Sequence, residues 1–130
     1  MVLKSYAKIN LTLTINNKLR SGLHNIQSIY CLINLHDKIF LKKNKNKYFD
    51  QVSFTGPFSK DINKSNNSVK KVLKVMRKNK IIHDYYSIKV SKKIPVFAGL
   101  GGGTSNAATL LKYLTKKSLN KKILSKITKE

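Results

Sequence analysis

Hydrophobic and polar residues alternate along the first part of the chain, and this alternation predicts strands. From residue 5 to residue 15 one face is polar and the other is apolar, with Ala7, Ile9, Leu11, Leu13 and Ile15 at the apolar positions. A period of two over this length is typical of a half-buried strand. Residues 26–40 predict a second, long or bent strand region, with Asp37 marking a turn within it. A lysine-rich loop over 42–50 and a short strand over 52–54 follow.

The period changes after residue 66. Apolar side chains then recur at helical spacing, at Val69, Val72, Leu73 and Met76. This pattern predicts an amphipathic helix capped by Asn66 or Asn67 and ending near Asn79. Residues 85–90 predict a further strand, and residues 104–114 and 119–127 predict two more helices. Strands, a helix, a strand and helices in this order indicate an α+β fold of two layers, with residues 1–130 forming one domain.

A glycine-rich segment lies between the last predicted strand and the helix over 104–114. Four of the six glycines of the chain fall between Pro95 and Ala108. Glycine has no Cβ, so its backbone N–H can approach a phosphate closely. A helix that begins at Thr104 or Ser105 adds unpaired N–H groups and the positive end of its dipole. The segment therefore predicts an anion cradle of the kind that binds nucleotide phosphates.

This segment matches neither of the two common phosphate loops. No lysine follows Gly103, as a Walker loop requires, and the third glycine of the dinucleotide-binding fingerprint is missing. A flexible linker is the alternative interpretation. Linkers are usually flanked by polar, disordered sequence, whereas a predicted strand and a predicted helix flank this segment. We therefore favour a built loop.

The chain is strongly basic, with 27 Lys and Arg against 5 Asp and Glu and a net charge of +22. Such a charge favours anionic partners, including polyphosphates and nucleic acids. However, arginine occurs only at Arg20 and Arg77, and the lysines are spread along the whole chain. Codons rich in A and T are enough to explain abundant Lys, Asn and Ile. A nucleic-acid partner is therefore not the favoured interpretation.

Other compositional signals are weaker. Cys31 lies in an apolar run and is expected to be a buried small hydrophobe. The single cysteine and three histidines show no metal-ligand spacing, so no protein metal site is predicted. No secretory signal or membrane-spanning run is evident, and we expect a cytoplasmic protein without a membrane partner.

Three motifs resemble the N-terminal half of kinases of the GHMP superfamily. They are Ser5-Tyr6-Ala7-Lys8-Ile9-Asn10-Leu11, then Gly22-Leu23-His24-Asn25-Ile26-Gln27-Ser28, and then the loop from Pro95 to Ala108. They occur in the family's order and spacing, and they cover nearly the whole chain. The resemblance implies the two-layer N-terminal domain of these kinases. It also implies ATP-dependent phosphorylation of a small molecule, with Mg²⁺.

The resemblance also implies roles for individual residues. Lys8 matches the catalytic lysine, and Asn10 matches a position that contacts substrate. His24 matches the histidine that binds a cytosine ring, which implies a cytidine diphosphate derivative as substrate. Asn67 and Lys92 are expected near the nucleotides, and Thr104 and Ser105 are expected to offer hydroxyls to phosphate or Mg²⁺. The ATP-binding residues implied are Pro95, Val96, Phe97, Ala98, Gly99, Leu100, Gly101, Gly102, Gly103, Thr104 and Ser105.

The chain departs from the family pattern in two places. The family commonly has an aromatic residue before the histidine, where this chain has Leu23. The family's catalytic aspartate follows the third helix, and the sequence ends before that segment. We therefore expect a truncated kinase domain, monomeric or homodimeric, that binds ATP weakly at best and does not turn over.

Two other functions stay open at this point. An RNA-binding module of similar fold would suit the net charge, although clustered arginines with exposed aromatics are missing. Another small-molecule kinase of the superfamily, acting on homoserine or mevalonate, is the third possibility. The segment around His24 argues against that third possibility.

The substitution Leu23→Tyr tests the predicted cytidine site. Leucine keeps apolar contact with a cytosine ring but lacks a flat π surface, so the variant is expected to bind cytidine diphosphate more tightly. Equilibrium titration of the two proteins measures the difference. Equal affinities would contradict this interpretation.

Overall fold

The computed structural model describes residues 1–45 and 48–115. The predicted helix over 119–127 lies outside these residues. The elements are β1 (Val2–Lys18), β2 (His24–Asn44), β3 (Gln51–Thr55), α1 (Ser68–Lys78), β4 (Tyr85–Ser91) and α2 (Gly102–Leu114).

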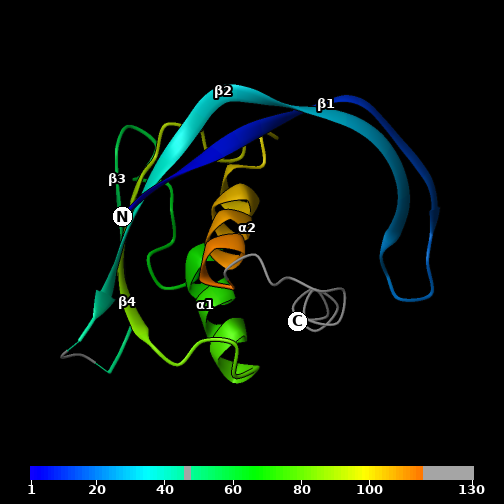
Figure 1. Ribbon diagram of the computed structural model, residues 1–130. Helices are drawn as coiled ribbons and strands as arrows, with labels where there is room; N and C mark the ends of the chain where they lie inside the picture. The colour runs from blue at the N-terminus through cyan, green and yellow to red at the C-terminus, as the bar shows by residue number, and fades with distance from the viewer. Residues whose placement is uncertain (46–47, 116–130) are drawn as a thin grey trace.

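The strands form one mixed sheet in the order β1-β2-β4-β3. β2 runs antiparallel to both β1 and β4, whereas β3 runs parallel to β4. Both helices lie side by side on one face of the sheet (Figure 1). The predicted α+β fold of two layers is therefore confirmed.

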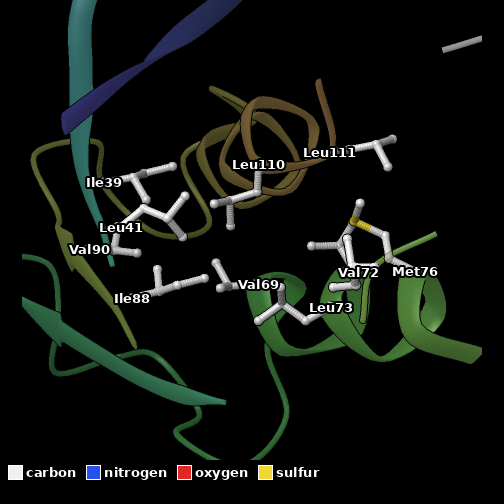
Figure 2. Packing of buried hydrophobic residues seen from close by; sticks show 11 residues of the cluster. Ile39, Leu41, Val69, Val72, Leu73, Met76, Ile88, Val90, Leu110 and Leu111 are labelled. Atoms are coloured by element: carbon white, nitrogen blue, oxygen red, sulfur yellow. The ribbon is translucent and has the colours of Figure 1, made fainter. Parts of the chain in front are cut away.

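The hydrophobic core lies between the sheet and the two helices. Figure 2 shows side chains of β2 and β4 pointing toward α1 and α2. Burial of these apolar surfaces is the main force that holds a two-layer domain together. The cluster comprises Ile39, Leu41, Val69, Val72, Leu73, Met76, Ile82, Ile88, Val90, Leu110 and Leu111. The helical spacing seen in the sequence placed all four α1 members of this set correctly.

The far part of the β1–β2 hairpin lies outside this core. It extends well beyond the two helices (Figure 1). Ala7 is fully buried, but Ile9, Leu11, Leu13 and Ile15 are 39–64% exposed. The prediction of a half-buried strand was therefore wrong beyond residue 7, because no helix among the described residues covers that part of the sheet. Cys31, on the same hairpin, is only half-buried and not buried as expected.

Several element boundaries differ from the predictions. Asp37 does not mark a turn: it lies inside β2, paired with Ser5 of β1. The strand continues to Asn44, into the region predicted as a loop. The bend in the hairpin comes instead from register shifts, the first of them between Tyr6 and Ala7. Helix α1 begins after the predicted cap Asn67, but α2 begins two residues before Thr104, at Gly102.

None of the described helices is long and apolar enough to cross a membrane.

Because the core is buried and the hairpin is exposed, leucine-to-alanine substitutions in the two regions should lower the free energy of unfolding by different amounts. Leu73→Ala removes a side chain that is 1% exposed, so it should lower the free energy of unfolding by about 2–5 kcal/mol. Leu13→Ala, at a site 53% exposed, should change it by less than about 1 kcal/mol. Urea denaturation followed by circular dichroism measures both. Similar losses for the two variants would show that the hairpin residue is buried in solution.

Candidate functional site

A pocket of about 470 Å³ lies where the starts of α1 and α2 meet. The glycine-rich loop and the first turn of α2 line this pocket, together with the segment that leads into α1. The lining residues are Phe54, Asp61, Ile62, Asn63, Asn66, Asn67, Ser68, Lys92, Pro95, Val96, Phe97, Ala98, Gly99, Leu100, Gly101, Gly102, Gly103, Thr104 and Asn106.

The backbone at the start of α2 requires glycine at two successive positions. Gly101 is the N-cap residue and has a φ of 68°, a left-handed conformation that favours glycine. A Cβ on Gly102 would lie 2.9 Å from Cγ2 of Ile94. Small residues therefore let the first turn of the helix pack tightly against the segment that follows β4.

No side chain caps this helix, and its first turn carries no acidic residue. The first N–H groups of a helix have no partner within the helix, and they form the positive end of its dipole. Residues 101–104 line the pocket, so this end of α2 is available to a bound anion.

The start of α1 is fixed beside the start of α2. The hydroxyl of Ser68 donates a hydrogen bond of 2.8 Å to the carbonyl of Gly103. Asn67 accepts from the N–H of Lys70 at 3.0 Å and donates to the carbonyls of Asn63 and Lys64. The side chain of Asn67 thus lines the pocket but is also engaged in capping α1.

Lys8 lies against the glycine-rich loop. Its backbone N–H donates to the carbonyl of Leu100 at 3.1 Å, so the loop pairs with β1 at this point. A Cβ on Gly101 would lie 3.3 Å from Cγ of Lys8, which shows how closely the lysine side chain passes the N-cap. The Lys8 ammonium donates to Oδ1 of Asn10 at 2.7 Å. Two predicted site residues are therefore in direct contact beside the start of α2.

A buried carboxylate, Asp37, holds the loop in place from beneath. It is 0% exposed and forms an ion pair with Lys92, which is 2% exposed. Its Oδ1 accepts from the backbone N–H groups of Lys93 and Ile94 at 2.7 and 2.9 Å. Its Oδ2 also accepts from the side-chain amide of Asn106 at 3.0 Å. One side chain of β2 therefore fixes both the entrance to the loop and the second turn of α2.

Ser105 ties α2 to β1 on the side away from the pocket. Its hydroxyl donates to the carbonyl of Tyr6 at 2.6 Å and accepts from the hydroxyl of Ser5 at 3.0 Å. Ser5 and Ala7 are both fully buried, and their small side chains let the helix approach the strand. The hydroxyl of Ser105 is thus engaged with β1, and among the two predicted hydroxyls only Thr104 lines the pocket.

Comparison with known proteins indicates the family of this fold. Residues 67–130 match the family described as the GHMP kinases N terminal domain. The 4-diphosphocytidyl-2-C-methyl-D-erythritol kinase of Pelagibacter ubique is 44% identical over 120 residues, which are 92% of this chain and 42% of that protein. The chain has the fold of the GHMP kinase N-terminal domain.

Solved structures show the same fold at low identity. A 4-(cytidine 5'-diphospho)-2C-methyl-D-erythritol kinase superposes with a TM-score of 0.64 and 22% identity, over 98% of this chain and 45% of that one. The homoserine kinase of Cytophaga hutchinsonii gives a TM-score of 0.62 and 17% identity, over 97% and 39%. The chain therefore spans less than half the length of the kinases it matches.

Within this domain, the predicted site residues form two separate groups. The pocket brings residues 95–104 together with Asn67 and Lys92. Lys8 packs against Gly101 of this lining, and its ammonium donates to Asn10. His24 and Leu23 lie elsewhere, at the tip of the long hairpin, because β1 ends at Lys18 and β2 begins at His24. Leu23 is 66% exposed, so this tip presents an open surface.

Sequence reasoning missed Asp37 and Asn106 as determinants of the site. Asp37 is in phase with Ile39 and Leu41, which face the core. An acidic residue at an inward-facing strand position needs a buried cation or hydrogen-bond donors beside it, because an unpaired buried charge is costly. This position was the signal that the sequence offered. Nothing in the sequence marked Asn106 as a partner of Asp37, because asparagine is common in the first turns of helices.

A second hollow, of about 870 Å³, lies on the other side of α2. It is lined by residues of β1, β2 and α2 and by Tyr86 of β4. Burial, together with the nearby charge of Asp84, raises the pKa of the Tyr86 phenol. Among the described residues, no three His, Cys, Asp or Glu side chains group together to hold a metal ion in either hollow.

The buried carboxylate predicts a large loss of stability on neutralisation. Asp37→Asn keeps the shape of the side chain but leaves the Lys92 ammonium buried without a counter-charge. The free energy of unfolding should fall by about 3–5 kcal/mol. The control Asp61→Asn changes an exposed carboxylate and should shift it by less than about 0.5 kcal/mol. Equal urea midpoints for the two variants would contradict the role given to Asp37.

Proposed function

We propose that this domain supplies the ATP-binding part and the catalytic lysine of a small-molecule kinase. The reaction proposed is ATP-dependent phosphorylation of the 2-hydroxyl of 4-diphosphocytidyl-2-C-methyl-D-erythritol, a step in isoprenoid precursor synthesis. The names of the relatives support this substrate. The single observation that carries the proposal is the close packing of Lys8 against the start of α2.

The nucleotide phosphates bind at the start of α2 in this proposal. The backbone N–H groups of residues 102–104 donate to phosphate oxygens, and the helix dipole favours their negative charge. The tight turn at Gly101 and Gly102 leaves no side chain between these N–H groups and the ligand. The high positive charge of the chain raises the local concentration of the anionic nucleotide.

Mg²⁺ fits this site as an ion carried by the nucleotide. Mg²⁺ prefers oxygen ligands and is commonly held by substrate phosphates with few protein groups. The hydroxyl of Thr104 and the exposed carboxylate of Asp61 are oxygen donors on the pocket wall. When bound, the ion would balance charge on the phosphates during transfer.

Lys8 places a positive charge where the phosphoryl group leaves the nucleotide. A fixed cation at this point stabilises the charge that develops on the transferred group. The hydrogen bond from its ammonium to Asn10 holds the flexible side chain in one position. Asp37 does not serve as the proton acceptor, because its carboxylate is buried and fully engaged by four donors.

The acceptor binds on the hairpin side of Lys8 in this proposal. Asn10 and His24 lie on β1 and β2 of the same hairpin, and both are exposed. His24 offers ring nitrogens that can hydrogen-bond a cytosine edge. The long hairpin thus extends the site from the reacting phosphoryl group toward a nucleotide-linked substrate.

Removing the lysine should weaken nucleotide binding. Lys8→Ala is expected to raise the dissociation constant for ATP about tenfold, which corresponds to one hydrogen bond between charged groups. Lys18→Ala removes an equal charge at the far end of β1 and should change it less than twofold. Equilibrium titration of ATP into each protein measures the constants. Equal effects of the two substitutions would show that only net charge matters.

The same titrations separate this function from the other candidates. Cytidine diphosphate should bind to the chain while ATP is bound. Homoserine or mevalonate should not displace the cytidine diphosphate. If the chain ignores ATP but binds RNA with a steep dependence on salt, the kinase proposal fails.

A further inference from the structure

Phe97 is the one residue of the pocket whose placement the folded chain does not explain. The residue is 94% exposed, so its ring has almost no protein surface against it. It also has a φ of 63°, a left-handed conformation that a bulky side chain rarely adopts. Exposure of an aromatic ring and an unfavourable backbone conformation are two separate costs to the folded state.

Neighbouring positions show that the loop does not need a large residue for its shape. Gly99 and Gly101 have φ values of 72° and 68°, close to that of Phe97, and both are glycine. A glycine at position 97 would adopt the same conformation without strain. The folded chain itself therefore gives no reason for a large side chain at position 97.

The pocket has an apolar part and a polar part. Phe54, Ile62 and Val96 line it together with Phe97, whereas the start of α2 supplies its N–H donors. Phe97 and Gly101 are four positions apart in the chain, so their Cα atoms are at most about 14 Å apart. A nucleoside triphosphate has the matching arrangement, since a flat apolar base and a charged phosphate chain are joined by a short sugar.

We propose that Phe97 stacks on the base of the bound nucleotide and so acts as its principal base-binding residue. This inference rests on the proposed function, and it adds the residue that holds the base. An aromatic ring stacks on any base through its π face, and the larger surface of a purine is favoured. The strained loop conformation presents the ring to the ligand, and stacking offsets the cost of its exposure.

The test compares ATP with inorganic tripolyphosphate, which has no base. Phe97→Leu keeps an apolar side chain and the same backbone strain but removes the flat ring. It should bind ATP at least about tenfold more weakly and bind tripolyphosphate within twofold of the parent chain. Phe97→Tyr keeps the ring and should bind both ligands as the parent chain does. NMR titration measures the constants even when they are millimolar.

Two further variants serve as controls. Phe97→Gly relieves the backbone strain, so it should raise the melting temperature and yet lose the same ATP affinity as Phe97→Leu. Tyr48→Leu removes another exposed aromatic, 89% exposed and outside this pocket, and should leave ATP affinity unchanged.

The outcomes distinguish a failure of the stacking role from a failure of the site. If Phe97→Leu binds ATP like the parent chain, or loses ATP and tripolyphosphate to the same extent, the stacking role is wrong. If the parent chain binds tripolyphosphate no more weakly than ATP, the base is not recognised and the stacking role is wrong. If it binds neither ligand, the proposed function itself fails, and the stacking role with it.

Discussion

The buried carboxylate of Asp37 is the constraint on which the rest of the site depends. A charged group without water needs every one of its hydrogen bonds satisfied by protein. Asp37 meets this requirement only when Lys92, the N–H groups of residues 93 and 94, and the amide of Asn106 all converge on it. Residues 92–94, which follow β4, and the second turn of α2 are therefore fixed relative to β2. The glycine-rich loop joins these two fixed points.

This constraint explains why the loop can be rich in glycine and still be ordered. Hydrogen bonds from Ser68, Lys8 and Ser105 fix the start of α2 to α1 and to β1. The glycines allow positive φ values and let the backbone pass close to its neighbours. The surrounding hydrogen bonds fix the loop in this conformation. An anion site built in this way needs little rearrangement when a ligand binds.

The sequence predicted those features that depend on local patterns. Helical spacing identified the buried face of α1, and the cap at Asn67 was confirmed, since its side chain accepts a hydrogen bond from the N–H of Lys70. The glycine-rich loop, and its position between β4 and α2, also followed from local residues. These signals are strong because neighbouring residues in the chain determine them.

Features set by distant contacts could not be predicted in this way. The apolar–polar alternation of β1 is the same at Ala7, which is fully buried, and at Leu13, which is 53% exposed. Asp37 was predicted to mark a turn, because aspartate is common in turns and nothing near it in the sequence indicated a buried partner. Its four hydrogen-bond donors come from residues more than fifty positions away in the chain. The early start of α2 at Gly102 has a related cause, since packing against Ile94 and Lys92 outweighs the low helix propensity of glycine.

The most direct test of this account is an NMR titration of the chain, labelled with nitrogen-15, with inorganic tripolyphosphate. The account predicts saturable shifts of the backbone amides of residues 101–104, together with Lys8, and little change at lysines elsewhere. Shifts spread over lysines of the whole surface, without saturation and with the amides of residues 101–104 unmoved, would contradict it.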